Sequence, residues 1–193
     1  MDIRELDRRA VRASVDVVAA VTPADLRRPT PCAGWALSDL LAHMTAQHHG
    51  FAAAAEGNGD DLTAWKVHPA GEDAVPRYAE AAERVIAAFA GEDVPGRTFS
   101  LPEFGPDARF PAEMAMSFHF IDYVVHAWDV ARTLDRPFTP EPDLVEAAWP
   151  IALAVPNGEE RLAPGAAFAP ALPAPADASR FHKILALLGR TQS

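Results

Sequence analysis

The sequence of 193 residues contains a single cysteine, Cys32, which excludes an internal disulfide framework. It has no run of about 18 apolar residues, the length that a membrane-spanning helix needs. Charged residues are scattered through residues 1–12, so the N-terminus lacks the continuous apolar core of a secretory signal. Together these absences predict a protein that works in the cytoplasm, in a reducing compartment and away from the membrane.

Positive charge is also scarce. The chain carries 17 lysine and arginine residues against 27 aspartate and glutamate residues, which gives a formal net charge of −10. Recognition of a phosphate backbone usually requires a basic stripe, and we find none along this sequence. We therefore expect no nucleic-acid partner and look for small-molecule partners, with a homodimer left as an option.

Apolar residues recur at intervals of three and four in four long segments, which predicts four amphipathic helices. We place these helices at residues 2–20, 37–55, 72–90 and 112–134. Shorter helices are expected at 142–154 and 178–189. Proline and glycine are so dense between residues 96 and 110 that only a loop or a short hairpin fits there.

The C-terminal region has a different composition. Residues 156–177 are rich in alanine and proline, which favours an extended segment. The apolar residues between 163 and 190 are too numerous for a solvated tail, so we expect segment 156–193 to pack on the helices within one domain, 1–193. The predicted fold class is all-α: a four-helix bundle with a short extra C-terminal helix and an extended proline-rich segment.

The helix expected at 112–134 carries an unusual polar stripe. Its members are three or four residues apart and so share one helix face: His119, Asp122, His126, Asp129 and Thr133. A solvent-facing stripe usually carries Lys, Glu and Arg, whereas histidine and aspartate are common metal ligands. The pattern alone leaves two interpretations open, a wet helix face and a row of ligands.

A metal site would need a third ligand from another helix, and residues 37–55 offer His43, His48 and His49. At about 100° per residue, His48 lies about 140° around the helix from His43, so their side chains diverge and only one can join comfortably. A core histidine bonded to a backbone carbonyl is the alternative. Cys32 is a candidate nucleophile, although a lone cysteine is more often a small buried hydrophobe.

Four stretches of the sequence resemble a known family: TPCAGWALSDLLAHM, LPEFGPDARFPAEM, DYVVHAWDVARTLDRPF and FAPALPAPADASRFHKILALLGR. The resemblance is to actinobacterial proteins of the DinB-like superfamily, specifically those related to the metal-binding domain of mycothiol-dependent maleylpyruvate isomerase. It extends over residues 30–190.

The resemblance implies a DinB-like four-helix bundle that holds a divalent metal ion, with zinc as first choice and nickel as second. The implied ligands are His43 from LLAHM and the pair Asp122 and His126 from DYVVHAWD. His119 and Asp129 then become candidates for groups that support these ligands. The implied activity is a thiol transferase or isomerase in which the ion activates a low-molecular-weight thiol such as mycothiol for attack on an electrophilic substrate. A non-catalytic bundle that binds a metal or a small ligand is the alternative.

Overall fold

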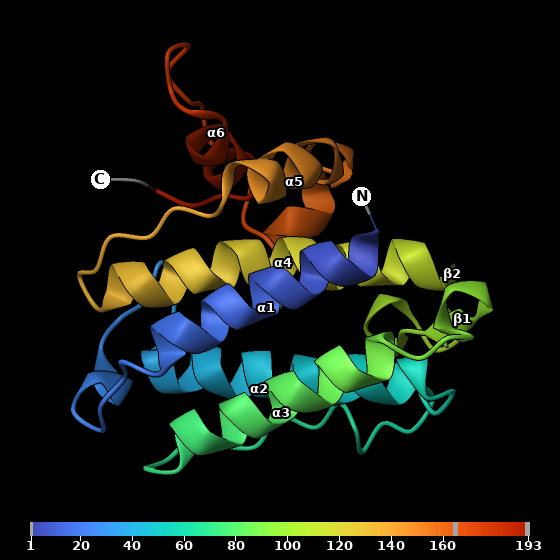
Figure 1. Cartoon of the computed structure of the whole chain (residues 1–193). Coiled ribbons are helices and arrows are strands. Elements are labelled where there is room, and N and C mark those ends of the chain that lie inside the picture. Colours follow the sequence, from blue (N-terminus) through green and yellow to red (C-terminus); the bar gives the residue numbers. More distant parts are fainter. Residues whose placement is uncertain (1, 164–165, 192–193) are drawn as a thin grey trace. The chain divides into compact units, whose positions relative to one another are not determined.

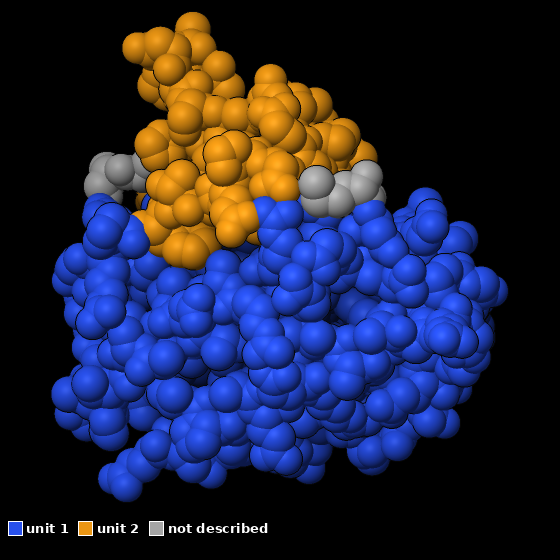
Figure 2. Space-filling view, in the orientation of Figure 1, with its two compact units in different colours: residues 1–137 blue, residues 138–193 orange. Residues whose placement is uncertain are grey.

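The computed structural model describes residues 2–163 and 166–191, which form two compact units (Figure 2). Unit 1 is Met1–Pro137 and unit 2 is Phe138–Ser193. Within the described residues the chain forms six α-helices and one two-stranded sheet, so the predicted all-α fold class is confirmed. None of the described helices is long and apolar enough to cross a membrane.

Unit 1 is built on the four predicted long helices. They are α1 (Ile3–Val18), α2 (Leu37–Ala55), α3 (Ala74–Phe89) and α4 (Ala112–Thr133). Helix α1 lies along α4, and α2 lies along α3 (Figure 1). The first and last residues of all four helices agree with the predicted ones to within about two residues, the usual uncertainty of helix boundaries.

Local chemistry sets these boundaries. Asp2 caps α1, because its Oδ1 accepts a hydrogen bond from the Arg4 backbone N–H at 2.9 Å. At the start of α2, the Ala36 N–H donates to the Asp39 carboxylate at 2.9 Å. Helix α2 ends at Ala55, and Gly57 follows the cap with a φ of 89°, the left-handed conformation that glycine adopts without a steric penalty. The helices therefore begin and end where their own residues satisfy the free backbone groups.

Two connections of unit 1 are closed by pairing between backbone segments. Strands β1 (Thr98–Ser100) and β2 (Arg109–Pro111) pair antiparallel, so the proline-rich stretch is a short hairpin. The loop before α2 is closed by a bridge between Pro29 and Ala36 and by a Thr30 N–H bond to the Trp35 carbonyl at 3.0 Å. This closed loop carries Cys32 and Trp35, and it follows the single turn η1 (Asp25–Arg27).

Unit 2 contains α5 (Pro142–Ala154), the turn η4 (Glu159–Leu162) and α6 (Arg180–Leu187), with α5 and α6 in contact. The buried guanidinium of Arg161 donates to the carbonyls of Pro156 and Leu187, each at 2.6 Å. It thereby connects the start of the proline-rich segment with the end of α6 inside the unit. Residues 164–165 and 192–193 of segment 156–193 lie outside the described residues, and the packing of that segment on the bundle stays a prediction.

Candidate metal centre

The structure brings the three predicted ligands together inside unit 1. His43 on α2 and the pair Asp122 and His126 on α4 each offer one donor atom, and these atoms all lie within 4.8 Å of one another. The His126 Nε2 atom is 3.2 Å from Asp122 Oδ1, and the His43 Nε2 atom is 3.9 Å from Asp122 Oδ2. The spacing on α4 and the choice of His43 among the histidines of α2 thus produce one convergent cluster, which we call the His43 cluster.

The donor atoms of the His43 cluster suit a single ion. Zinc bonds of about 2.0–2.2 Å in tetrahedral geometry place two ligand atoms about 3.3 Å apart. The 3.2 Å separation between His126 Nε2 and Asp122 Oδ1 lies close to that value, and His43 Nε2 approaches the other oxygen of the same carboxylate at 3.9 Å. Two imidazole nitrogens and one carboxylate oxygen are donors that both zinc and nickel accept.

The cluster is partly open to solvent. The side chains of His43 and Asp122 are 26% and 20% exposed, whereas that of His126 is 4% exposed. Trp35, itself 37% exposed, lies beside His43 with its ring centroid 5.1 Å from the imidazole. A small molecule can therefore reach the cluster from the His43 side, beside the Trp35 indole.

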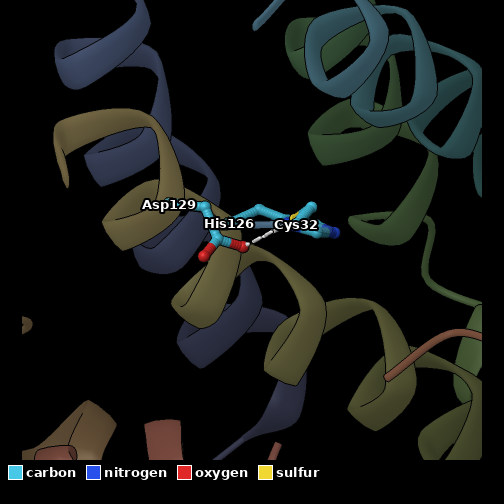
Figure 3. Close-up of side chains that lie close together, drawn as sticks. All are labelled: Cys32, His126 and Asp129. Atoms are coloured by element: carbon cyan, nitrogen blue, oxygen red, sulfur yellow. Dashed lines mark hydrogen bonds and ion pairs between the residues drawn. The ribbon is translucent and has the colours of Figure 1, made fainter. Parts of the chain in front are cut away.

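Asp129 supports His126 from the buried side. Its Oδ2 lies 2.9 Å from His126 Nδ1 and 3.3 Å from the Cys32 Sγ, which donates to it (Figure 3). An imidazole that gives its Nδ1–H to a carboxylate keeps its Nε2 lone pair for another partner, and here Nε2 faces Asp122. Asp129 thus fixes both the orientation and the tautomer of His126.

A second donor set shares His126 with the first. Cys32, His126 and Asp129 also offer three donor atoms within 4.8 Å of one another (Figure 3). This set uses the other face of the imidazole, where Asp129 is fully buried. The sequence placed Cys32 only as a candidate nucleophile, because the loop that carries it has no periodic pattern from which its neighbours could be predicted.

The charges of the His43 cluster favour a cation. Burial by itself would lower the pKa of His126, but the charge of Asp122 and the hydrogen bonds with Asp122 and Asp129 outweigh it and hold that pKa well above its ordinary value. Burial would likewise raise the pKa of Asp122, and the two imidazoles hold it well below its ordinary range. Without a metal, a proton on His126 therefore supplies the positive charge between these carboxylates.

The polar stripe of α4 contains a second cluster, which we call the His119 cluster. His119 Nδ1 lies 2.6 Å from Asp7 Oδ1 on α1, and His119 Nε2 lies 3.2 Å from His48 Nδ1 on α2. All three side chains are buried, and His48 stacks on Tyr123 at a centroid distance of 4.0 Å. Both ring nitrogens of His119 are thus occupied by residues other than the three predicted ligands.

The sequence analysis did not identify Asp7 as a member of the His119 cluster. Asp7 lies four residues before Val11 and three before Ala10, on the apolar stripe of α1. A charged residue on an apolar stripe is the signal that would have identified it, since a buried carboxylate needs a partner. Burial raises the pKa of Asp7, while the charge and hydrogen bond of His119 oppose that shift.

One further carboxyl lies near the His43 cluster. Gln47 lies on α2, one helical turn after His43. Its side-chain amide donates to Glu103 Oε2 at 3.1 Å, and Glu103 belongs to the turn η3 (Pro102–Phe104). Burial and the negative charge of Asp122 raise the pKa of Glu103 to about 7, although contact of the side chain with solvent works against that shift. Glu103 thus adds a further acidic group on the side of the cluster that Gln47 faces.

Comparison with known proteins places the chain in a family. Residues 8–131 match the family model of the mycothiol maleylpyruvate isomerase N-terminal domain. Two uncharacterized proteins from two strains of Mycobacterium tuberculosis are each 29% identical to the chain over 196 residues, an alignment that covers 99% of both partners.

Two solved structures share the fold. A crystal structure of a histidine-to-alanine variant of mycothiol-dependent maleylpyruvate isomerase aligns with a TM-score of 0.61 at 13% identity. A further crystal structure of that isomerase aligns with a TM-score of 0.58 at 15% identity. Each alignment covers 79% of this chain and 67% of the other. Because the matched residues 8–131 make up more than half of the sequence, the chain belongs to the mycothiol maleylpyruvate isomerase N-terminal domain family.

Proposed function

We propose that this protein is a metal-dependent enzyme that acts with a low-molecular-weight thiol of the mycothiol type. The observation that carries the proposal is the convergence of three donor atoms within 4.8 Å, with two of the three side chains partly exposed. The family description and the names of the similar structures, which contain the word mycothiol, support the choice of thiol. Zinc is the ion we propose first, and nickel second.

In this proposal His43, Asp122 and His126 hold the ion. The ion would bind the sulfur of the thiol and lower the thiol pKa, so that a thiolate is available near neutral pH. His43 and His126 contribute neutral nitrogens, and Asp122 contributes the negative charge. Asp129 accepts the Nδ1–H of His126 and so keeps Nε2 directed at Asp122.

The exposed side of the cluster is where thiol and substrate would enter. Three protein ligands leave at least one coordination position for another molecule, whereas a purely structural zinc site is normally closed by four. A thiolate sulfur is a nucleophile for electrophilic carbon, so S-transfer and thiol-assisted isomerisation are both reactions that this arrangement supports.

A second candidate is a non-catalytic metal-binding bundle. The set of Cys32, His126 and Asp129 favours it, and we call this the buried set because two of its three members, His126 and Asp129, are buried. A metal held there would have the cysteine sulfur as a ligand. Two of its three ligands would be buried, because Asp129 is fully buried and the His126 side chain is only 4% exposed, whereas Cys32 is partly exposed. The two candidates differ in whether the sulfur near the ion belongs to the protein or to an added thiol.

Cobalt substitution separates the two candidates, because a sulfur bound to cobalt produces charge-transfer absorption. We would load the Cys32→Ser variant with cobalt and add mycothiol. The proposed function predicts that the absorption appears only after thiol is added, and that the His43→Ala variant fails to show it. An unchanged spectrum at saturating mycothiol, with cobalt still bound, would contradict the enzyme. Absorption in the wild-type protein without thiol that Cys32→Ser removes would favour the buried site.

A further inference from the structure

A pocket of about 260 Å³ lies between α2, α3 and the loop that joins them. Helix α2 contributes a stripe of residues three or four apart: Ala42, Thr45, Ala46 and His49. His43 is absent from the lining, because at about 100° per residue it points to a different side of α2 from this stripe. The α2–α3 pocket is therefore separate from the candidate metal centre.

The charge of the α2–α3 pocket is opposite to that of the whole chain. Its lining includes three cationic side chains, Lys66, Arg77 and Arg84, together with the two histidines His49 and His68. None of its twelve lining residues is acidic, although the chain as a whole has a formal net charge of −10. Such a local excess of positive charge favours negatively charged ligands.

Neighbouring carboxylates neutralise this charge only in part. Arg84 pairs with Glu56 at 2.9 Å, whereas Arg77 and Asp73 are 4.0 Å apart, at the limit of an ion pair. Within residues 2–163 and 166–191, no carboxylate pairs with Lys66. Two of the three cations therefore remain available to a ligand.

The other polar groups of the pocket are less available as donors. The Thr45 hydroxyl donates to the Leu41 carbonyl at 2.7 Å, and the Thr63 hydroxyl donates to Asp61 Oδ1 at 2.7 Å. His49 Nδ1 is buried and lacks a hydrogen-bond partner among the described residues. The groups that can bind a ligand are therefore the cationic side chains and the imidazoles. Both can donate hydrogen bonds to a ligand, and neither carries a negative charge that would repel an anion.

Lys66 belongs to an ordered part of the loop. The preceding residue, Trp65, donates its indole N–H to the Gly59 carbonyl at 2.9 Å. The Trp65 ring also packs directly on Gly50 of α2, where an added Cβ would lie 2.2 Å from a ring atom. Trp65 thus holds the loop against α2, which places Lys66 at the pocket instead of leaving it on a free loop.

We propose that the α2–α3 pocket binds a small organic anion, with a carboxylate or phosphate group held by Lys66 and Arg77. The five alanines of the lining provide an apolar surface for the short body of such a molecule: Ala42, Ala46, Ala64, Ala70 and Ala74. A volume of about 260 Å³ is slightly below that of typical drug-sized pockets, so the ligand is a small acid. This site does not depend on the proposed metal chemistry.

The test uses the full chain and two probes, succinate and inorganic phosphate, at low ionic strength. We expect saturable changes in the backbone amide spectrum at residues of the pocket, and no change with the neutral analogue succinamide. The double variant Lys66→Ala, Arg77→Ala should bind at least about tenfold more weakly, because it loses two charge-assisted contacts. Comparison of the two probes decides between carboxylate and phosphate.

A matched control keeps the net charge loss the same. Arg12→Ala with Arg27→Ala removes two charges from residues that do not line the pocket and should bind the probes as the wild type does. The pKa of His49 gives a second readout. Burial and the positive charges of Arg84, Arg77 and His68 lower this pKa, and the charge of Glu80 opposes them. A bound anion should raise the pKa of His49. Equal weakening in both double variants, or no saturable change with either probe, would overturn the proposal.

Discussion

The His43 cluster and the His119 cluster share helix α4 and use the same two residue types, yet their donor atoms meet differently. In the His43 cluster three donors converge within 4.8 Å, and two of the side chains are partly exposed. In the His119 cluster the groups form a line, Asp7 to His119 to His48, and all are buried. Convergence beside solvent suits an ion with open positions, whereas a buried line satisfies polar groups in the core. Helical spacing alone does not separate the two.

The largest expected difference between the clusters is in metal content. We expect His43→Ala to lose the proposed divalent ion, because only Asp122 and His126 of the three proposed ligands would remain. Metal analysis of protein purified without a histidine tag measures this loss.

The His119→Gln variant is the contrasting case, since it removes a histidine from the other cluster and should retain about one ion per chain. Full metal occupancy in His43→Ala, with loss in Cys32→Ser, would place the ion in the buried set and remove the distinction that we draw between the clusters.

The His119 cluster should instead determine stability. Asp7→Ala leaves the buried His119 Nδ1 without its hydrogen-bond partner, and an unsatisfied buried polar group typically costs about 1–3 kcal/mol. We expect the free energy of unfolding, measured by urea denaturation of the metal-free protein, to fall by about that amount.

The exposed Asp16 lies on the same helix and provides a matched control. Asp16→Ala should change the free energy of unfolding by less than about 0.5 kcal/mol. A similarly small change for Asp7→Ala would mean that the cost of burying the Asp7 carboxylate already cancels the stabilisation from its contact with His119. Loss of metal together with stability would show that the two clusters are coupled.

The sequence predicts the helices well, because apolar periodicity and capping residues are local signals. The end of α2 follows from Gly57, which is visible in the sequence, whereas the Ala36–Asp39 contact at its start is seen only in the structure. The pair Asp122 and His126 is likewise local, since both lie on one helix. The third ligand was assigned from the family resemblance, because periodicity leaves three histidines of α2 as candidates.

Contacts between distant segments could not be predicted in the same way. The approach of Cys32 to Asp129 depends on the closed loop between Pro29 and Ala36. The partnership of Asp7 with His119 spans two helices far apart in the chain. The three-residue spacing places Asp129 on the same helix face as His126. It gives no information about which ring nitrogen of His126 the carboxylate contacts. Such contacts are set by the packing of whole elements.

A smaller effect is expected from the group that orients His126. Asp129→Asn keeps the size of the side chain but removes the negative charge that accepts the His126 Nδ1–H. Loss of such a supporting contact typically weakens metal binding by about 10–100-fold, and we expect a change in that range. Competition with a chelator of known affinity measures it. Glu113→Gln, the same acid-to-amide change at an exposed position near the start of α4, is the control and should leave the affinity unchanged.

The smallest and most gradual effect is the pH dependence of the His43 cluster. The pKa of His126 in the metal-free protein lies well above 6.5, and a metal requires the neutral imidazole, so ion and proton compete for one nitrogen. Below that raised pKa, the apparent metal affinity should fall about tenfold per pH unit. Calorimetry in two buffers of different ionisation enthalpy should show about one proton released per ion bound.

Stability of the metal-free protein should run in the opposite direction. A group whose folded pKa is raised contributes stability that is fully present below its unfolded value, here 6.5, and is lost as the pH rises through the folded pKa. Raising the pH above 6.5 should therefore lower the melting temperature of the metal-free protein while increasing the stabilisation that added zinc provides. His126→Gln should lose both trends, because it has no proton to exchange. Parallel trends in the metal-free and zinc-loaded protein would show that the ion does not displace the His126 proton.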